Sequence, residues 1–100
     1  MTDLFVRRSG DPASAAIVFL HGGGISGKMW QPQLAGLAEY YCLAPDLPEH
    51  GQSTNSGPFT LKRAADAVAS VIRELVPGGR AHIVGLSVGG AVGIELMRDN

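Results

Sequence analysis

Three short stretches of the chain are rich in apolar residues and do not alternate between polar and apolar positions. They comprise residues 15–20, 40–44 and 81–85. Apolar runs of this length are typical of strands that are buried on both faces of a parallel sheet. We therefore predict three parallel strands here, with residues 4–8 as a short leading strand.

The segments between these runs have the periodicity of helices. Over residues 61–75 the apolar positions recur every three or four residues, and charged residues occupy the opposite side. Thr60 is placed to cap this helix, and Pro77-Gly78-Gly79 follows its end. Its predicted buried face consists of Leu61, Ala65, Val68, Ile72 and Leu75.

Two further helices follow from the same pattern. Residues 31–38 predict a short helix that has Pro32 in its first turn. Its inward residues are expected to be Leu34, Leu37 and Ala38. Another helix is expected to begin at Ser87, with Val92, Leu96 and Met97 directed inward.

Strands and helices alternate along the chain, which predicts an α/β fold of three layers built on a doubly wound, mostly parallel sheet. One hundred residues allow at most one domain, and residues 1–100 are short for a domain of this architecture. Ligands of such folds bind beyond the carboxyl ends of the strands. The loops after the three predicted strands, residues 21–28, 46–57 and 85–90, should therefore form one functional edge.

Composition narrows the possible partners. The net charge is −1 and no block of like charges is present, so neither nucleic acid nor a membrane surface is expected as a partner. The single cysteine, Cys42, excludes an intrachain disulfide and a zinc site of paired cysteines, and its strand position indicates a core residue. The amino terminus has no secretory signal and residues 15–20 are too few to span a bilayer, so we expect a cytoplasmic protein.

The third strand is followed by Gly85-Leu86-Ser87-Val88-Gly89, which has the pattern G-x-S-x-G. Between a buried strand and a helix, this pattern predicts a nucleophile elbow, a tight turn that exposes a reactive serine. The glycines leave room for neighbouring backbone, and the helix amino terminus favours a developing negative charge. Ser87 is the predicted nucleophile; the competing interpretation is a serine that only caps a helix.

The loop after the first strand, FLHGGGISGKMW, supports two interpretations. Residues 22–28 spell G-x-x-x-x-G-K, close to a phosphate-binding P-loop, with Asp46 as a possible metal-binding acid. Against a nucleotide site, Met29 stands where that motif needs Ser or Thr. Residues 21–24 spell HGGG, which offers a backbone N–H to an oxyanion. We favour an oxyanion hole formed by the backbone amides of Gly23 and Val88.

Together these motifs resemble the α/β-hydrolase superfamily in order and spacing: HGGG, then APDLPEHGQS, then GLSVGG. The resemblance covers the chain from Ala15 onward. It implies a serine hydrolase without a cofactor or metal, with Ser87 as nucleophile and the Gly23 and Val88 amides as oxyanion hole. The residues that it implies shape the loops are His21, Asp46, His50, Gly51 and Ser53. Glu49 departs from the family pattern, which commonly has glycine there.

The rest of a catalytic triad is not apparent in the sequence. A serine needs a base, and the family order places an acid and then a histidine after the nucleophile. No histidine follows Ser87. Of the earlier histidines, His21 is expected to support the oxyanion loop, His50 is the one candidate base, and His82 lies at the far end of its strand. We therefore interpret the chain as the amino-terminal part of a hydrolase domain, incomplete at its carboxyl end.

This interpretation has a structural consequence. The strand at residues 81–85 would be an unpaired edge, which we expect to associate with a second copy or with the missing carboxyl-terminal half. The expected reaction is acyl-enzyme formation on a small ester, thioester or related carbonyl substrate. The alternatives are a truncated, non-catalytic module for binding or assembly, and a P-loop nucleotide-binding protein.

Overall fold

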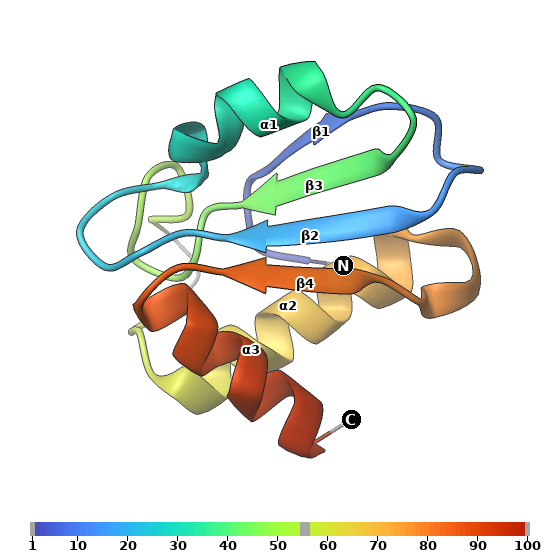
Figure 1. Cartoon of the computed structure of the whole chain (residues 1–100). Helices are drawn as coiled ribbons and strands as arrows, with labels where there is room; N and C mark the ends of the chain where they lie inside the picture. Colours follow the sequence, from blue (N-terminus) through green and yellow to red (C-terminus); the bar gives the residue numbers. More distant parts are fainter. Residues whose placement is uncertain (1, 55–56, 100) are drawn as a thin grey trace.

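A computed structural model describes residues 2–54 and 57–99 of the chain (Figure 1). Its four strands form one mixed sheet in the order β1-β3-β2-β4. They span Val6–Ser9 (β1), Ala16–Leu20 (β2), Tyr41–Pro45 (β3) and His82–Gly85 (β4). Strand β2 pairs in parallel with β3 and β4, whereas β1 is antiparallel to β3. The predicted strands are confirmed to within two residues at each end.

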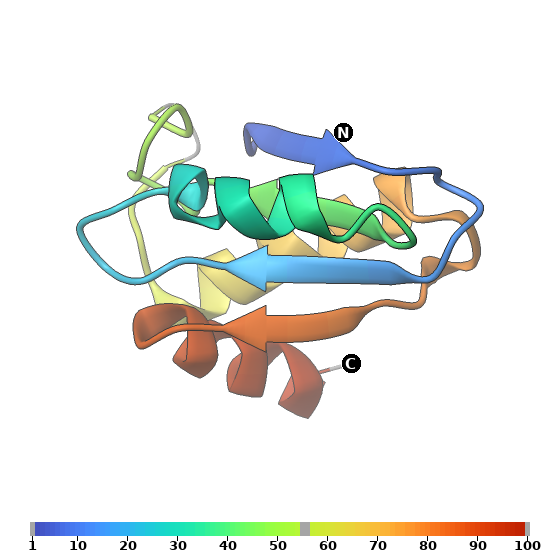
Figure 2. The same ribbon diagram turned by 45° about the horizontal axis from the view of Figure 1, so that its top comes forward.

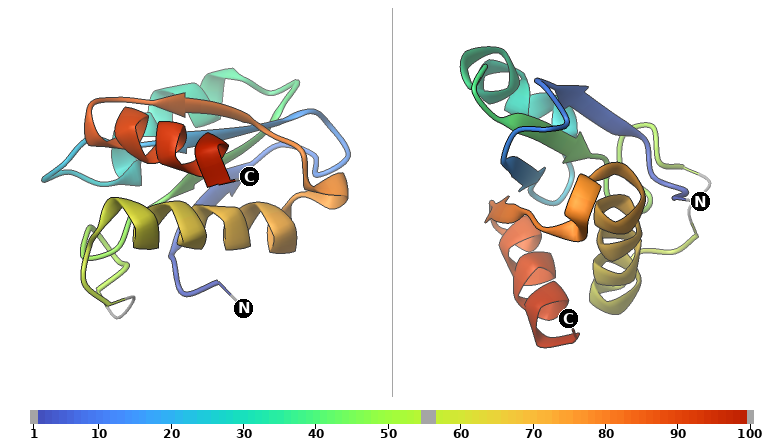
Figure 3. Two further views of the ribbon diagram at one scale, coloured as in Figure 1. Left: turned by 90° about the horizontal axis from the view of Figure 1, so that it is seen from below. Right: turned by 90° about the vertical axis from the view of Figure 1, so that its right-hand side faces the viewer.

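Helices cover both faces of this sheet, as Figures 1 and 2 show. Helix α1 (Gln31–Gly36) lies on one face, and α2 (Leu61–Leu75) and α3 (Val88–Asp99) lie on the other. Short 3₁₀ turns at Gly27–Trp30 (η1) and Pro77–Gly79 (η2) precede α1 and follow α2. The end-on view on the right of Figure 3 separates the three layers, which confirms the predicted architecture.

Helix α2 has the predicted bounds and cap, because the Thr60 hydroxyl accepts a hydrogen bond from the N–H of Arg63 at 3.0 Å. The predicted buried face is wrong for Leu61, which is 40% exposed. Small residues instead let α2 pack closely on α3, so the buried stripe is rotated from the expected one. It consists of Ala64, Ala65, Val68, Ala69 and Val71.

Two other predicted inward residues are exposed. Helix α1 ends at Gly36, and Leu37 adopts a non-helical conformation, so Ala38 lies outside the helix and is exposed. In α3, Val92 and Leu96 are buried as predicted, but Met97 is 74% exposed. Strand β4 is the last strand in the sheet order, so nothing in the described part of the chain covers this side of α3.

The core is divided by the sheet into two clusters. The larger fills the space between the sheet and helices α2 and α3, and includes Val18, Leu43 and Val92. The smaller lies under α1 and contains Cys42, which is fully buried, as predicted for a core residue. Burial raises the pKa of the Cys42 thiol, which disfavours the reactive thiolate.

No helix in residues 2–54 and 57–99 is long and apolar enough to cross a membrane.

Candidate active site

The three loops singled out in the sequence meet at one edge of the sheet. Strands β2, β3 and β4 all point toward this edge, at the left of Figure 1, and each continues directly into its loop. The N–H of Leu86 donates to the carbonyl of Leu20 at 3.0 Å, which joins the ends of β4 and β2. The loop that carries Ser87 is therefore fixed beside the loop that carries the glycine triplet, residues 22–24.

The turn at Ser87 has the geometry of a nucleophile elbow. Ser87 has a φ of 56°, a left-handed conformation that is uncommon for a residue other than glycine. A Cβ on Gly85 would lie 2.7 Å from the backbone of Gly89, and one on Gly89 would lie 2.6 Å from the carbonyl oxygen of His21. Both glycines are thus required by close main-chain contacts, and the turn leaves Ser87 exposed at its tip. Strained residues of this kind cluster at functional sites.

The glycine triplet lies against this elbow. A Cβ placed on Gly22 would be 3.8 Å from the Cβ of Ser87, and one on Gly23 would be 3.6 Å from Cγ1 of Val88. The loop of the glycine triplet therefore lies in direct reach of the turn that carries Ser87. The structure therefore brings together the residues that the sequence pointed to, Ser87, Gly23 and Val88.

Both candidate oxyanion donors are open to a ligand. In the part of the chain that the structure describes, the backbone N–H of Gly23 forms no hydrogen bond, and neither does that of Val88. Val88 is also the first residue of α3, where the positive end of the helix dipole lies. Two unpaired amides beside a serine can stabilise negative charge on an oxygen bound between them.

His21 is buried and holds two loops together. Its Nε2 accepts a hydrogen bond from the N–H of Leu47 at 3.0 Å, so its Nδ1 carries the proton and donates to the carbonyl of Gly22 at 2.7 Å. Burial lowers the pKa of His21, which favours this neutral tautomer. With both ring nitrogens engaged, His21 supports the loop that carries the glycine triplet, as expected from the sequence, and is not available as a base.

Asp46 holds the same edge together with its carboxylate. The group is fully buried and pairs with the Arg7 guanidinium at 2.7 Å. Its oxygens also accept hydrogen bonds from the N–H groups of Gly27 at 2.7 Å and Gln52 at 2.8 Å. The role of Arg7 was not found from the sequence, which shows only a cation in the predicted leading strand.

The second loop contains the residue that departs from the family pattern. Glu49 has a φ of 65°, so it adopts a conformation that glycine would take without strain. Its carboxylate accepts a hydrogen bond from the N–H of Phe59, which holds the loop against the segment before α2. The glycine-like turn is therefore retained with glutamate in place.

His50 packs between two rings, with centroids 5.0 Å from His21 and 5.6 Å from Phe59. Its Nδ1 lies 2.9 Å from the carbonyl oxygen of Pro48. Within the described residues, none of the three histidines forms a hydrogen bond with Ser87. The base for Ser87 is thus not found among these contacts.

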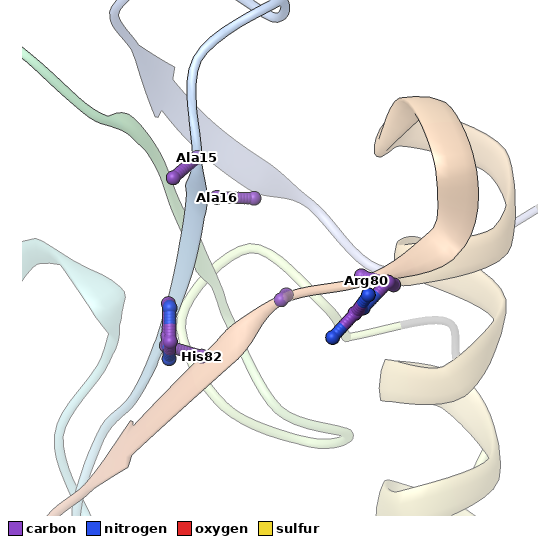
Figure 4. A pocket seen from close by; sticks show the side chains of 5 residues that line it. Ala15, Ala16, Arg80 and His82 are labelled. Carbon is purple, nitrogen blue, oxygen red and sulfur yellow. The ribbon is translucent and has the colours of Figure 1, made fainter.

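A separate cavity of about 270 Å³ opens at the opposite edge of the sheet, at the amino ends of β2 and β4. It is lined by Ala15, Ala16, Arg80, Ala81 and His82. Figure 4 shows that the side chains of Arg80 and His82 lie apart rather than converging on one point. His82 is exposed and far along β4 from Ser87, as expected.

No three His, Cys, Asp or Glu side chains in residues 2–54 and 57–99 could hold a metal ion.

The nucleotide-binding alternative loses its main support in the structure. Asp46, its candidate metal ligand, is buried and committed to Arg7 and two backbone amides. The 3₁₀ turn η1 does begin at Gly27, earlier than the helix start expected from Pro32, but α1 itself begins at Gln31. Trp30, at the end of η1, packs on Phe19 with ring centroids 5.0 Å apart, so it is a core residue and not part of a nucleotide site.

The chain matches known proteins over most of its length. A model of the alpha/beta hydrolase family matches residues 17–99. An AB hydrolase superfamily protein of Gibberella zeae is 36% identical over 97 residues, which cover 95% of this chain and 34% of that protein. An esterase of Mycobacterium tuberculosis is 40% identical over 82 residues, covering 80% of this chain and 27% of the esterase.

Solved structures agree with these matches. An N-acyl homoserine lactonase complexed with N-butanoyl homoserine superposes with a TM-score of 0.83 at 34% identity, covering 96% of this chain and 36% of the lactonase. A thermophilic esterase of Thermogutta terrifontis, with malate bound, gives a TM-score of 0.85 at 28% identity, covering 95% of this chain and 35% of the esterase. The chain thus spans about a third of the length of the relatives that it matches.

Proposed function

Because the chain belongs to the alpha/beta hydrolase family and its relatives include esterases and lipases, we propose that it carries the nucleophile and the oxyanion hole of a serine hydrolase. The substrate would be a small ester, thioester or related carbonyl compound. The observation that carries this proposal is the left-handed Ser87, set between close-packed glycines and facing the glycine triplet.

In the proposed reaction, the Ser87 oxygen attacks the carbonyl carbon of the substrate while a base removes the hydroxyl proton. The carbonyl π electrons move to its oxygen, and the backbone amides of Gly23 and Val88 donate hydrogen bonds to the resulting anion. Collapse of this intermediate breaks the bond to the alcohol or thiol, which departs with the proton that the base had accepted. The acyl group remains bound to the Ser87 oxygen as an acyl-enzyme. Water then releases the acid and regenerates the serine. Each oxyanion donor is expected to contribute about 10²–10³-fold in rate.

An external base makes this proposal testable in the chain itself. We expect a fluorophosphonate probe to label Ser87, and imidazole added to the solution to accelerate the labelling by accepting the hydroxyl proton. The adduct, located by peptide mass spectrometry, should be absent from Ser87→Ala. Ser70→Ala is the matched control, because Ser70 lies on α2 and bonds only to Arg73 in the contacts described. Labelling at another serine, or no labelling with imidazole present, would refute the proposal.

Within residues 2–54 and 57–99 no base contacts Ser87, and this favours a second candidate, a non-catalytic module for binding or assembly. Loss of a whole triad costs about 10⁶-fold in kcat in a serine protease, although some catalysis over water remains. Turnover of a nitrophenyl ester by this chain, abolished in Ser87→Ala, would exclude this candidate. Phosphonate labelling without any turnover would support it.

A further inference from the structure

A cleft of about 500 Å³ opens beside the oxyanion loop. It is lined by Gly24, Ile25, Ser26, Lys28, Met29 and Gly51. Of the residues that line it, Ile25 lies toward the proposed nucleophile, because a Cβ on Gly22 would lie 3.5 Å from Cδ1 of Ile25 and 3.8 Å from the Cβ of Ser87. A substrate held at Ser87 can therefore extend along Ile25 into this cleft.

The cleft contains one cationic side chain, that of Lys28. Lys28 is exposed, and within residues 2–54 and 57–99 its ammonium group has no ion-pair partner. The two acids nearest in the neighbouring loop are engaged elsewhere. Asp46 pairs with Arg7, and the Glu49 carboxylate accepts the N–H of Phe59. The cleft thus presents an uncompensated positive charge beside apolar walls.

The backbone that carries Lys28 is held in place. The Ser26 hydroxyl caps η1 by accepting the N–H of Lys28 at 3.2 Å, and the N–H of Gly27 donates to Asp46 at 2.7 Å. A Cβ on Gly27 would lie 2.7 Å from the carbonyl oxygen of Ala44, so this turn is packed directly on the end of β3. A charge on a fixed turn loses less conformational freedom when it binds a ligand.

We propose that Lys28 binds a carboxylate of the substrate, so that the preferred substrates are esters that also bear a free carboxylate. This inference rests on the proposed function of Ser87. The side chains of Ile25 and Met29 would contact the methylene groups between the ester and the carboxylate. The Lys28 ammonium is a flexible point charge, and it suits a carboxylate at the end of such a chain.

Monomethyl succinate and dimethyl succinate test this assignment, because they share the methyl ester and differ in one negative charge. In a titration of the ¹⁵N-labelled chain near pH 7.5, we expect the monoester to shift the amide signals of residues 24–29 and Gly51 in a saturable manner. The diester should bind roughly three- to tenfold more weakly, as should the monoester to Lys28→Gln. Lys28→Arg should retain the preference for the monoester.

Lys62→Gln is the matched control, because Lys62 is the chain's other lysine and lies on α2, where it pairs with Asp66. Equal affinity for the two esters, or an unchanged preference in Lys28→Gln, would overturn the inference. The phosphonate experiment separates the two proposals. Labelling of Ser87 without a charge preference removes only the carboxylate subsite. A Lys28-dependent preference without labelling of Ser87 removes the proposed hydrolase chemistry and, with it, the ester preference, and leaves Lys28 as a carboxylate-binding residue alone.

Discussion

The imidazole of His21 accepts a hydrogen bond from the backbone N–H of Leu47, 3.0 Å from its Nε2. This bond ties the glycine loop after β2, the proposed oxyanion loop, to the loop after β3. It requires a neutral ring, because a protonated Nε2 would meet the N–H of Leu47 donor to donor. The position of the glycine loop therefore depends on the protonation state of one buried side chain.

This dependence predicts a loss of stability in mild acid. Burial lowers the pKa of His21 in the folded protein from its ordinary value of 6.5. Well above pH 6.5 the ring is neutral in both states and adds no pH dependence. Below it, the unfolded chain takes up the proton first, so the free energy of unfolding falls as the pH is lowered toward the folded-state pKa. Urea unfolding between pH 7.5 and 5 measures this slope.

The variant His21→Gln should reduce the slope and destabilise the protein by ~1–3 kcal/mol at pH 7.5, because the N–H of Leu47 loses its partner. His82→Gln serves as the control, since His82 is exposed on β4 and should keep the wild-type slope. An unchanged slope in His21→Gln would show that other groups cause the acid sensitivity.

The elbow glycines predict a sharp contrast between two Gly→Ala variants. In Gly89→Ala the new Cβ would lie 2.6 Å from the carbonyl oxygen of His21, so the main chain must move. We expect a destabilisation of ~1–3 kcal/mol and slower phosphonate labelling of Ser87. In Gly36→Ala, on α1, the Cβ meets nothing within 4 Å, and we expect a gain of up to about 1 kcal/mol. Thermal unfolding of both variants measures this contrast, and equal effects would contradict it.

The buried carboxylate of Asp46 predicts another contrast. Asp46→Asn leaves Arg7, itself only 15% exposed, without its counter-charge. The expected loss is ~3–5 kcal/mol in the free energy of unfolding. Asp66→Asn removes an exposed pair with Lys62 and should change stability by less than about 0.5 kcal/mol. Denaturant unfolding of the two variants provides the measurement. A small effect of Asp46→Asn would mean that the backbone amides alone hold the loops.

Much of this edge could be predicted from the sequence because its geometry depends on local patterns. The apolar runs defined β2, β3 and β4, and G-x-S-x-G placed Ser87 at a turn that only glycines permit on either side. Contacts between distant segments were not predictable. Arg7 meets Asp46 only because β1 pairs with β3 in an antiparallel register. The exposure of Leu61 and Met97 likewise depends on how helices pack and on where the sheet ends, which periodicity does not specify.

The sheet edge at β4 predicts self-association of this chain. Its strand has no outer partner in the described part of the protein, and the adjoining face carries exposed apolar side chains. These are Val84, Leu86, Ile94 and Met97. The same face has a hollow of about 200 Å³ lined by glycines of α3 and β4 together with Ile94 and Met97. Because the face holds both projections and a hollow, a second copy can pack on it about a two-fold axis.

We expect light scattering at micromolar concentration to show a dimer or larger species. The charge introduced by Met97→Lys should shift the population toward monomer, because a charge buried in an apolar interface is unfavourable. Leu61→Lys is the matched control, since Leu61 is an exposed apolar residue at the start of α2, and it should leave the association unchanged. A dilute monomer with strong amide protection along residues 81–85 would contradict this expectation. Protected amides in a monomer would mean that the strand is already covered within the chain and needs no second copy.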